Sequence, residues 1–142
     1  MFVVIEPTTW QEFLQWVNRG GFAWRDLLGQ DKWLEWTPVR TGWTDVGAPT
    51  VTGRFRIVGR ECGIQIAINP ATSIATVAGT SYIDLPVTAA NAAASCGMGN
   101  MMNVTANTGV GVCVIRPSLN RIYVPAQAAS GNNFAIAGWF EI

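Results

Sequence analysis

The stretch from Thr52 to Ile68, TGRFRIVGRECGIQIAI, constrains the fold more than any other, because it predicts a β-hairpin with a single register. Side chains alternate along a strand, so a two-residue turn at Gly59-Arg60 sorts the stretch into two faces. The apolar face holds Phe55, Ile57, Cys62 and Ile64, and the polar face holds Arg54 opposite Gln65 and Arg56 opposite Gly63. A slip of one residue would mix the two sets, so the pattern fixes the pairing. Glycine in the first turn position favours a type II′ turn, and a sheet with one wet face is typically antiparallel.

The chain from Trp43 onward continues in short alternating stretches separated by turn residues. After the hairpin, strands are expected within Ser73–Leu85 (two strands), Val110–Val114, Arg121–Val124 and Phe134–Ile142. Residues 91–109 are small and polar and are expected to be flexible, although three methionines there, Met98, Met101 and Met102, could pack inward. Seven or eight short strands at this spacing predict an all-β fold, an antiparallel β-sandwich or jelly-roll-like domain over residues 44–142.

The first 43 residues differ in composition and are predicted to form an N-terminal arm with one short helix. They hold six of the seven tryptophans, and Thr9 and Glu12 have the spacing of a capping box. Residues 22–36 fit either two short helical turns or an irregular arm. Because so short a helix must dock on something, the aromatic residues are either core of the same domain or anchors that fill pockets on a partner. The candidate docking residues are Trp10, Phe13, Leu14 and Val17, which share one helical stripe, together with Trp24, Trp33 and Trp36.

Charged residues are scarce and balanced. They make up 13% of the chain, and the nine basic and nine acidic residues give a net charge of zero. The protein therefore has no net electrostatic field that would attract nucleic acid or a membrane surface. From Cys62 to Ile142 the only charged side chains are Asp84, Arg116, Arg121 and Glu141. Either identical neighbours or a larger assembly cover this half, or its surface is neutral but hydrated. No run is long enough to span a membrane and no signal peptide is recognisable, so the product is expected in the cytoplasm when it is made.

Most of the residue types that catalysis relies on are missing. The sequence contains no histidine, which removes the commonest general base and the commonest transition-metal ligand. Three cysteines without C-x-x-C spacing predict free thiols and no zinc site, and no phosphate-binding loop is present. We therefore expect no enzyme, no metal and no cofactor. Tyr82 and Tyr123 are candidates for a ligand platform on which a sugar would stack, although packing is the more ordinary role of rings in strands.

Several short motifs resemble small β-sandwich domains of tailed-bacteriophage virion proteins. The stretch Thr52–Arg60, TGRFRIVGR, is similar to their G-x-Y-x-(K/R)-(I/V)-G-(K/R) hairpin, and Gly79–Pro86, GTSYIDLP, to their T-x-Y-I-x-L-P strand. Asn120–Pro125, NRIYVP, and Ile136–Phe140, IAGWF, match their closing strands. The resemblance covers about 100 residues and does not include the arm.

This resemblance implies a jelly-roll-like accessory subunit of a phage particle, usually a homotrimer, that decorates or cements the capsid or forms the knob of a fibre. It implies no catalytic residues. We therefore expect a non-enzymatic virion structural protein, made in the host bacterial cytoplasm and docked through its N-terminal arm. Its expected partners are further copies of itself and other virion proteins such as the major capsid or tail proteins. The alternative is a receptor- or glycan-binding tip of a tail fibre, with a host surface glycan as partner. Neither expectation involves nucleic acid or insertion into a membrane.

Overall fold

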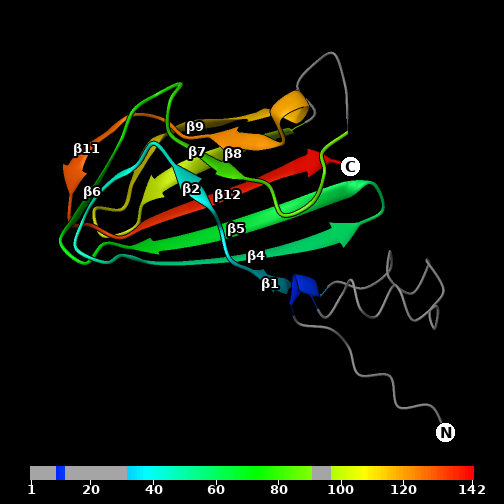
Figure 1. Ribbon diagram of the computed structural model, residues 1–142, viewed down its shortest axis with the longest axis horizontal. Helices are drawn as coiled ribbons and strands as arrows, with labels where there is room; N and C mark the ends of the chain where they lie inside the picture. The colour runs from blue at the N-terminus through cyan, green and yellow to red at the C-terminus, as the bar shows by residue number, and fades with distance from the viewer. Residues whose placement is uncertain (1–8, 12–31, 91–96) are drawn as a thin grey trace, which may run out of the picture.

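The computed structural model describes residues 9–11, 32–90 and 97–142, and over these the regular structure of the chain is mostly antiparallel β (Figure 1). The expected all-β class is therefore confirmed. The strands are β1 (Leu34–Trp36), β2 (Arg40–Thr41), β3 (Thr44–Val46), β4 (Thr50–Val58), β5 (Glu61–Asn69), β6 (Ser73–Thr76), β7 (Tyr82–Asp84), β8 (Gly97–Asn103), β9 (Thr108–Arg116), β10 (Arg121–Tyr123), β11 (Gln127–Ser130) and β12 (Phe134–Glu141). A 3-10 turn, η1 (Pro117–Leu119), links β9 to β10.

The hairpin of β4 and β5 has the register that the sequence predicts. Phe55 pairs with Ile64, Ile57 with Cys62 and Arg54 with Gln65, and the strands stay in step over nine residue pairs. Gly59 has a φ of 61°, whereas Arg60 is not among the residues with positive φ. A positive φ at the first turn position alone is the geometry of a type II′ turn, as expected.

Nine strands form one sheet, in the order β1-β4-β5-β12-β8-β9-β10-β7-β2. Its two outermost strands, β1 and β2, are joined by only three residues, 37–39. The sheet must therefore curl until its two edges lie close together, with one face of each strand turned toward an enclosed core. A second sheet has the order β11-β6-β3, and β11 and β6 lie at the left-hand end of the molecule in Figure 1.

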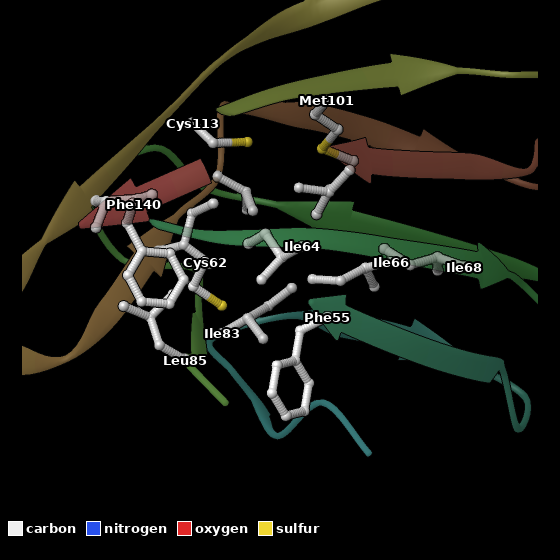
Figure 2. Packing of buried hydrophobic residues seen from close by; sticks show 14 of the residues in the cluster. Phe55, Cys62, Ile64, Ile66, Ile68, Ile83, Leu85, Met101, Cys113 and Phe140 are labelled. Atoms are coloured by element: carbon white, nitrogen blue, oxygen red, sulfur yellow. The ribbon is translucent and has the colours of Figure 1, made fainter. Parts of the chain in front are cut away.

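The core gathers side chains from strands that are far apart in the sheet. Figure 2 shows Ile83 of β7 and the following Leu85 close to Cys62 of β5 and Phe140 of β12. All four are buried, and Cys62, Ile83 and Phe140 are fully so. Because β7 is five strands away from β5 in the sheet order, this packing requires the curled shape. The apolar side of the predicted hairpin is thus one wall of the core.

Two glycines that face each other across β12 and β8 allow close packing inside the curl. Gly138 pairs with Gly99. A Cβ on Gly138 would lie 2.7 Å from the carbonyl oxygen of Met98, and a Cβ on Gly99 would lie 3.3 Å from Cδ1 of Ile122 on β10. Side chains at either position would force the strands or the opposite wall apart.

A buried serine ties the smaller sheet to the larger one. Ser81 is completely buried just before β7. Its hydroxyl donates to the carbonyl oxygen of Gly42, after β2, at 2.6 Å, and accepts from the backbone N–H of Val77, after β6, at 2.8 Å. One side chain therefore satisfies two backbone groups from separate turns.

The structure departs from the sequence predictions in two places. β1 and β2 belong to the sheet although they lie in the segment assigned to the arm, residues 1–43; strands of three and two residues are too short to show an alternating pattern. The expectation that residues 91–109 are flexible is wrong for β8, where Met101 is fully buried while Met98 and Met102 face outward. Of the predicted helix, Trp10 and Gln11 are helical, and Phe13, Leu14 and Val17 lie outside the described residues.

Candidate interaction surface

Large apolar side chains line up across the outer face of the curled sheet. Cross-strand pairing joins Trp139 of β12 to Met98 of β8, Met98 to Val114 of β9, Val114 to Tyr123 of β10 and Tyr123 to Tyr82 of β7. These five residues form what we call the apolar row. Met98 is 56% exposed, Val114 50% and Trp139 45%, so the part of the row on β12, β8 and β9 is open to solvent. Val112 and Met102, in neighbouring outward positions, are also exposed.

Strands with alternating faces ordinarily place polar residues on the solvent side. Here the outer positions of β12, β8 and β9 are mostly uncharged, and several are large and apolar. A contiguous exposed apolar patch of this kind usually marks a surface that another molecule covers. Trp, Tyr, Met and Arg are also the residue types that are enriched in the cores of protein interfaces.

The two tyrosines of the predicted ligand platform lie side by side at one end of this row. Their ring centroids are 5.4 Å apart, with the planes tilted by 51°. Each ring also carries an arginine: the guanidinium carbon of Arg121 lies 4.1 Å from the Tyr82 centroid, and that of Arg116 lies 5.2 Å from the Tyr123 centroid. A sugar stacking on those ring faces would have to displace a guanidinium group.

A second row of outward residues, parallel to the first, carries the charges. Glu61 of β5 pairs with Glu141 of β12, Arg116 of β9 pairs with Arg121 of β10, and Arg121 pairs with Asp84 of β7. We call these five residues the charged row. The ion pair between Arg121 and Asp84 is long, with Nε 3.6 Å from Oδ1. Within the described residues, Glu61, Glu141 and Arg116 have no ion-pair partner.

Three of the tryptophans predicted to dock on a partner pack on this chain's own β4. Trp10 meets Phe55 edge to face at 5.8 Å, and Trp36 packs over Gly53, where a Cβ would lie 2.7 Å from its ring. The ring of Trp33 contacts two guanidinium groups of β4, with the Arg54 carbon 5.1 Å and the Arg56 carbon 4.9 Å from the ring centroid. The remaining candidate docking residues, Phe13, Leu14, Val17 and Trp24, lie outside the described residues.

An open groove of about 1000 Å³ runs along the sheet beside β1. Alanines of β5 and β12, Ala67, Ala135 and Ala137, contribute small side chains, and Trp10 and Trp36 also line it. The polar lining includes Glu35, Arg54 and Gln65, of which Arg54 donates two hydrogen bonds to Oε1 of Gln65 at 2.8 and 2.6 Å. The groove continues the outer face toward β4 and offers space for an apolar side chain.

The two cysteines that the structure describes are buried. Cys62 and Cys113 are free thiols inside the core, and burial raises the pKa of each thiol to about 12. A thiol in that state is a poor nucleophile near neutral pH. Over residues 9–11, 32–90 and 97–142, no three His, Cys, Asp or Glu side chains come together as a metal site. The same residues include no helix long and apolar enough to cross a membrane.

Sequence reasoning selected Tyr82 and Tyr123 as a platform but did not join them to the other residues of the apolar row. Trp139 and Val114 appear in the sequence as members of alternating strands, and alternation does not say which of the two sets faces inward. The available signal was a large apolar side chain in both alternating sets of one strand: in Phe134–Glu141 the residues between the buried ones include Trp139 rather than only polar side chains.

No protein-family model, curated protein or solved structure matches this chain.

Proposed function

We propose that this protein is a non-enzymatic structural subunit that is incorporated into a larger particle through the outer face of its sheet. The single observation that carries this proposal is the apolar row, of which Trp139, Met98 and Val114 are about half exposed on adjacent strands. Leaving so much apolar surface in water is unfavourable, and covering it releases about 25 cal/mol per Å². Incorporation of the subunit into an assembly would cover that surface.

The particle that we propose is a tailed-bacteriophage virion, in which the chain is an accessory subunit of the capsid-decoration, cement or short-fibre type. The support for this part is the resemblance of the motifs in Thr52–Arg60, Gly79–Pro86 and Asn120–Pro125 to virion β-sandwich domains. The docking arm remains part of the proposal through Phe13, Leu14, Val17 and Trp24. Trp10, Trp33 and Trp36 hold the start of the chain against β4 instead.

The finer architecture belongs to the same proposal. We propose that the curled sheet is a β-sandwich of the jelly-roll-like kind, with β4, β5 and β12 in one wall and β9, β10 and β7 in the other. The packing of Ile83 against the side of the core that holds Cys62 supports this arrangement. An experimental map should then show two walls about 10 Å apart, whereas a round barrel cross-section would reject the sandwich.

Two measurements test the function. Mass spectrometry of density-gradient-purified phage particles, from cells that produce this chain, should find it at a fixed ratio to the major capsid protein. A chain that stays in the soluble fraction and is missing from the particles would reject the proposed role. Purified protein should also rebind particles that lack it.

A matched pair of substitutions shows whether the apolar row is the surface used. Val114→Lys places a charge in the row, and Val46→Lys places the same charge on β3, where the valine is 51% exposed compared with 50% for Val114. Both changes are on exposed positions and should shift the free energy of unfolding by no more than about 0.5 kcal/mol. We expect incorporation into particles to be lost with Val114→Lys and kept with Val46→Lys. Equal incorporation of the two variants would mean that the apolar row is not the contact.

One alternative function has an observation in its favour. Tyr82 and Tyr123 do come together, so a receptor- or glycan-binding fibre tip would have an aromatic platform flanked by two arginines. A glycan array tests this reading with the wild-type protein and with Tyr82→Ala as the control. Binding of a defined glycan that disappears in the variant supports the alternative, and no binding to any glycan rejects its glycan-binding form.

A further inference from the structure

We propose that the molecule covering the apolar row is a second copy of this chain, and that the copies close into a ring whose axis runs parallel to the strands beside β8. This inference takes its setting from the proposed function, a structural subunit, and adds the identity of the partner across this face. It rests on the charged row, which the proposed function does not use.

The arrangement of charge along the sheet is far from random. Between Cys62 and Ile142 the chain contains only four charged side chains, and all four, Asp84, Arg116, Arg121 and Glu141, lie in the charged row. On the four strands nearest β8 the signs are separated, and Asp84 follows the arginines on β7. The two glutamates face each other on β5 and β12, and the two arginines face each other on β9 and β10, with β8 between the two pairs.

Each of these pairs is unfavourable in an isolated molecule, because like charges directly opposite one another in a sheet repel. The two pairs cannot relieve each other within one copy, since Glu141 and Arg116 are separated by two strand spacings, about 10 Å. The acidic pair has no ion-pair partner among the described residues, and the arginine pair has one ion-pair partner, Asp84 at 3.6 Å, besides the stacking of both guanidinium groups on Tyr82 and Tyr123. The β5–β12 side of β8 therefore carries two negative charges, and the β9–β10–β7 side carries two positive charges that Asp84 offsets in part.

A rotation about an axis parallel to the strands satisfies both pairs at once. Such a rotation does not change the position of a cross-strand row along the axis, so the charged row of one copy meets the charged row of the next. It also exchanges the two sides of β8, which brings Glu61 and Glu141 of one copy against Arg116 and Arg121 of its neighbour. Charge complementarity of this kind selects the partner and fixes the register of a contact.

The same rotation brings apolar surface to apolar surface. At the height of the apolar row, the β12 side carrying Trp139 meets the β9 side carrying Val114 of the neighbouring copy. The outer face is convex because the sheet curls around its core. The outer surface slopes away from β8 on both sides, toward β12 and β5 and toward β9 and β10, so each copy is wedge-shaped at β8. Wedge-shaped subunits can pack side by side around an axis. Rings of two, three or four copies all obey this rule, and the mass of the oligomer tells them apart.

Charge exchange tests the ring directly. The full-length wild type, measured by light scattering behind a sizing column, should elute as a whole-number multiple of 15.3 kDa. Two double variants, Glu61→Lys/Glu141→Lys and Arg116→Glu/Arg121→Glu, each make both flanks alike in sign and should elute as monomers. The variant carrying all four changes has complementary flanks again and should recover the oligomer of the wild type.

The controls separate this mechanism from a general effect of charge or folding. Exchanging Arg40 and Asp45, an ion pair at 2.9 Å outside the row, should leave the oligomer intact. Far-ultraviolet circular dichroism and thermal unfolding show whether each variant is folded. Raising the salt from 0.05 to 0.5 M should weaken the wild-type ring by at least about tenfold in dissociation constant, because exposed ion pairs are screened. This salt response keeps the proposal testable if a variant fails to fold.

Three results would overturn the proposal. They are a wild type that remains monomeric at high micromolar concentration, double variants that assemble as well as the wild type, and a folded fourfold variant that stays monomeric. None of these results bears on whether the chain is a particle component, which mass spectrometry of purified particles decides separately. A ring that forms in solution with no chain in the particles would reject the proposed function and leave the ring standing.

Discussion

Replacing Phe55 by alanine is the sharpest test of how the hairpin carries the fold. The side chain has no exposed surface, pairs with Ile64 across β4 and β5, and meets the ring of Trp10 edge to face at 5.8 Å. Truncating a buried phenylalanine to alanine typically costs about 3–5 kcal/mol, because apolar contact is lost and a cavity remains. The aromatic pair contributes about 1 kcal/mol beyond area. We therefore expect a loss near the upper end, about 4–5 kcal/mol in the free energy of unfolding.

Arg54→Ala on the adjacent position provides the matched comparison. Arg54 is exposed, and its contacts are the hydrogen bonds to Gln65 and the stacking on Trp33. Exposed contacts of these kinds contribute about 1 kcal/mol together. Urea titrations followed by tryptophan fluorescence should thus separate the two variants by about 3 kcal/mol. Losses of similar size would mean that β4 does not present Phe55 to the core and Arg54 to the solvent, and the reasoning from alternation would fail.

Three further predictions concern the interior. Cys62 and Cys113 should react with a thiol reagent at pH 8 only as fast as the fold opens. The folded pKa of each thiol, about 12, lies above the ordinary value of 9.0, so the stability that the protonated thiols support is complete below pH 9 and falls as the pH rises from 9 toward 12. Denaturant midpoints measured at pH 8 and pH 10.5 would reveal this loss. Ser81→Ala should cost about 2 kcal/mol by leaving two backbone groups without their hydrogen bonds, whereas an unchanged melting temperature would show that water replaces the hydroxyl. Gly138→Ala should cost at least about 2 kcal/mol because its Cβ meets a backbone oxygen at 2.7 Å, and a stable variant would show that β12 can shift away from β8.

Local chemistry made the β4–β5 hairpin predictable. Its register follows from alternation between Thr52 and Ile68 and from one turn glycine, and both act between neighbours in the chain. The same reasoning found β9, β10 and β12, in which apolar residues recur at every second position. It placed Tyr82 and Tyr123 on strands, and the structure brings these two together.

Features that depend on pairing between distant strands could not be predicted in the same way. β8 contains glycine, asparagine and three methionines, and it forms a strand because β12 and β9 pair with it on both sides. β1 is three residues long and owes its place to Leu34, which is buried opposite Phe55. The charged row has no local signature at all, since its members are scattered from residue 61 to residue 141 and meet only through the strand order.

The scarcity of charge and the exposure of the apolar row have one physical consequence when they are considered together. An apolar surface gives affinity but little orientation, because dispersion and the hydrophobic effect are non-directional. A few charges at fixed positions on the edge of such a surface give orientation, because a wrong register places like charges opposite each other. The four charges between Cys62 and Ile142 all lie beside the apolar row, at the one height where they would control how a neighbour approaches. Additional charges elsewhere on β12, β8 or β9 would improve the solubility of the monomer, but they would also have to be desolvated whenever the face is covered.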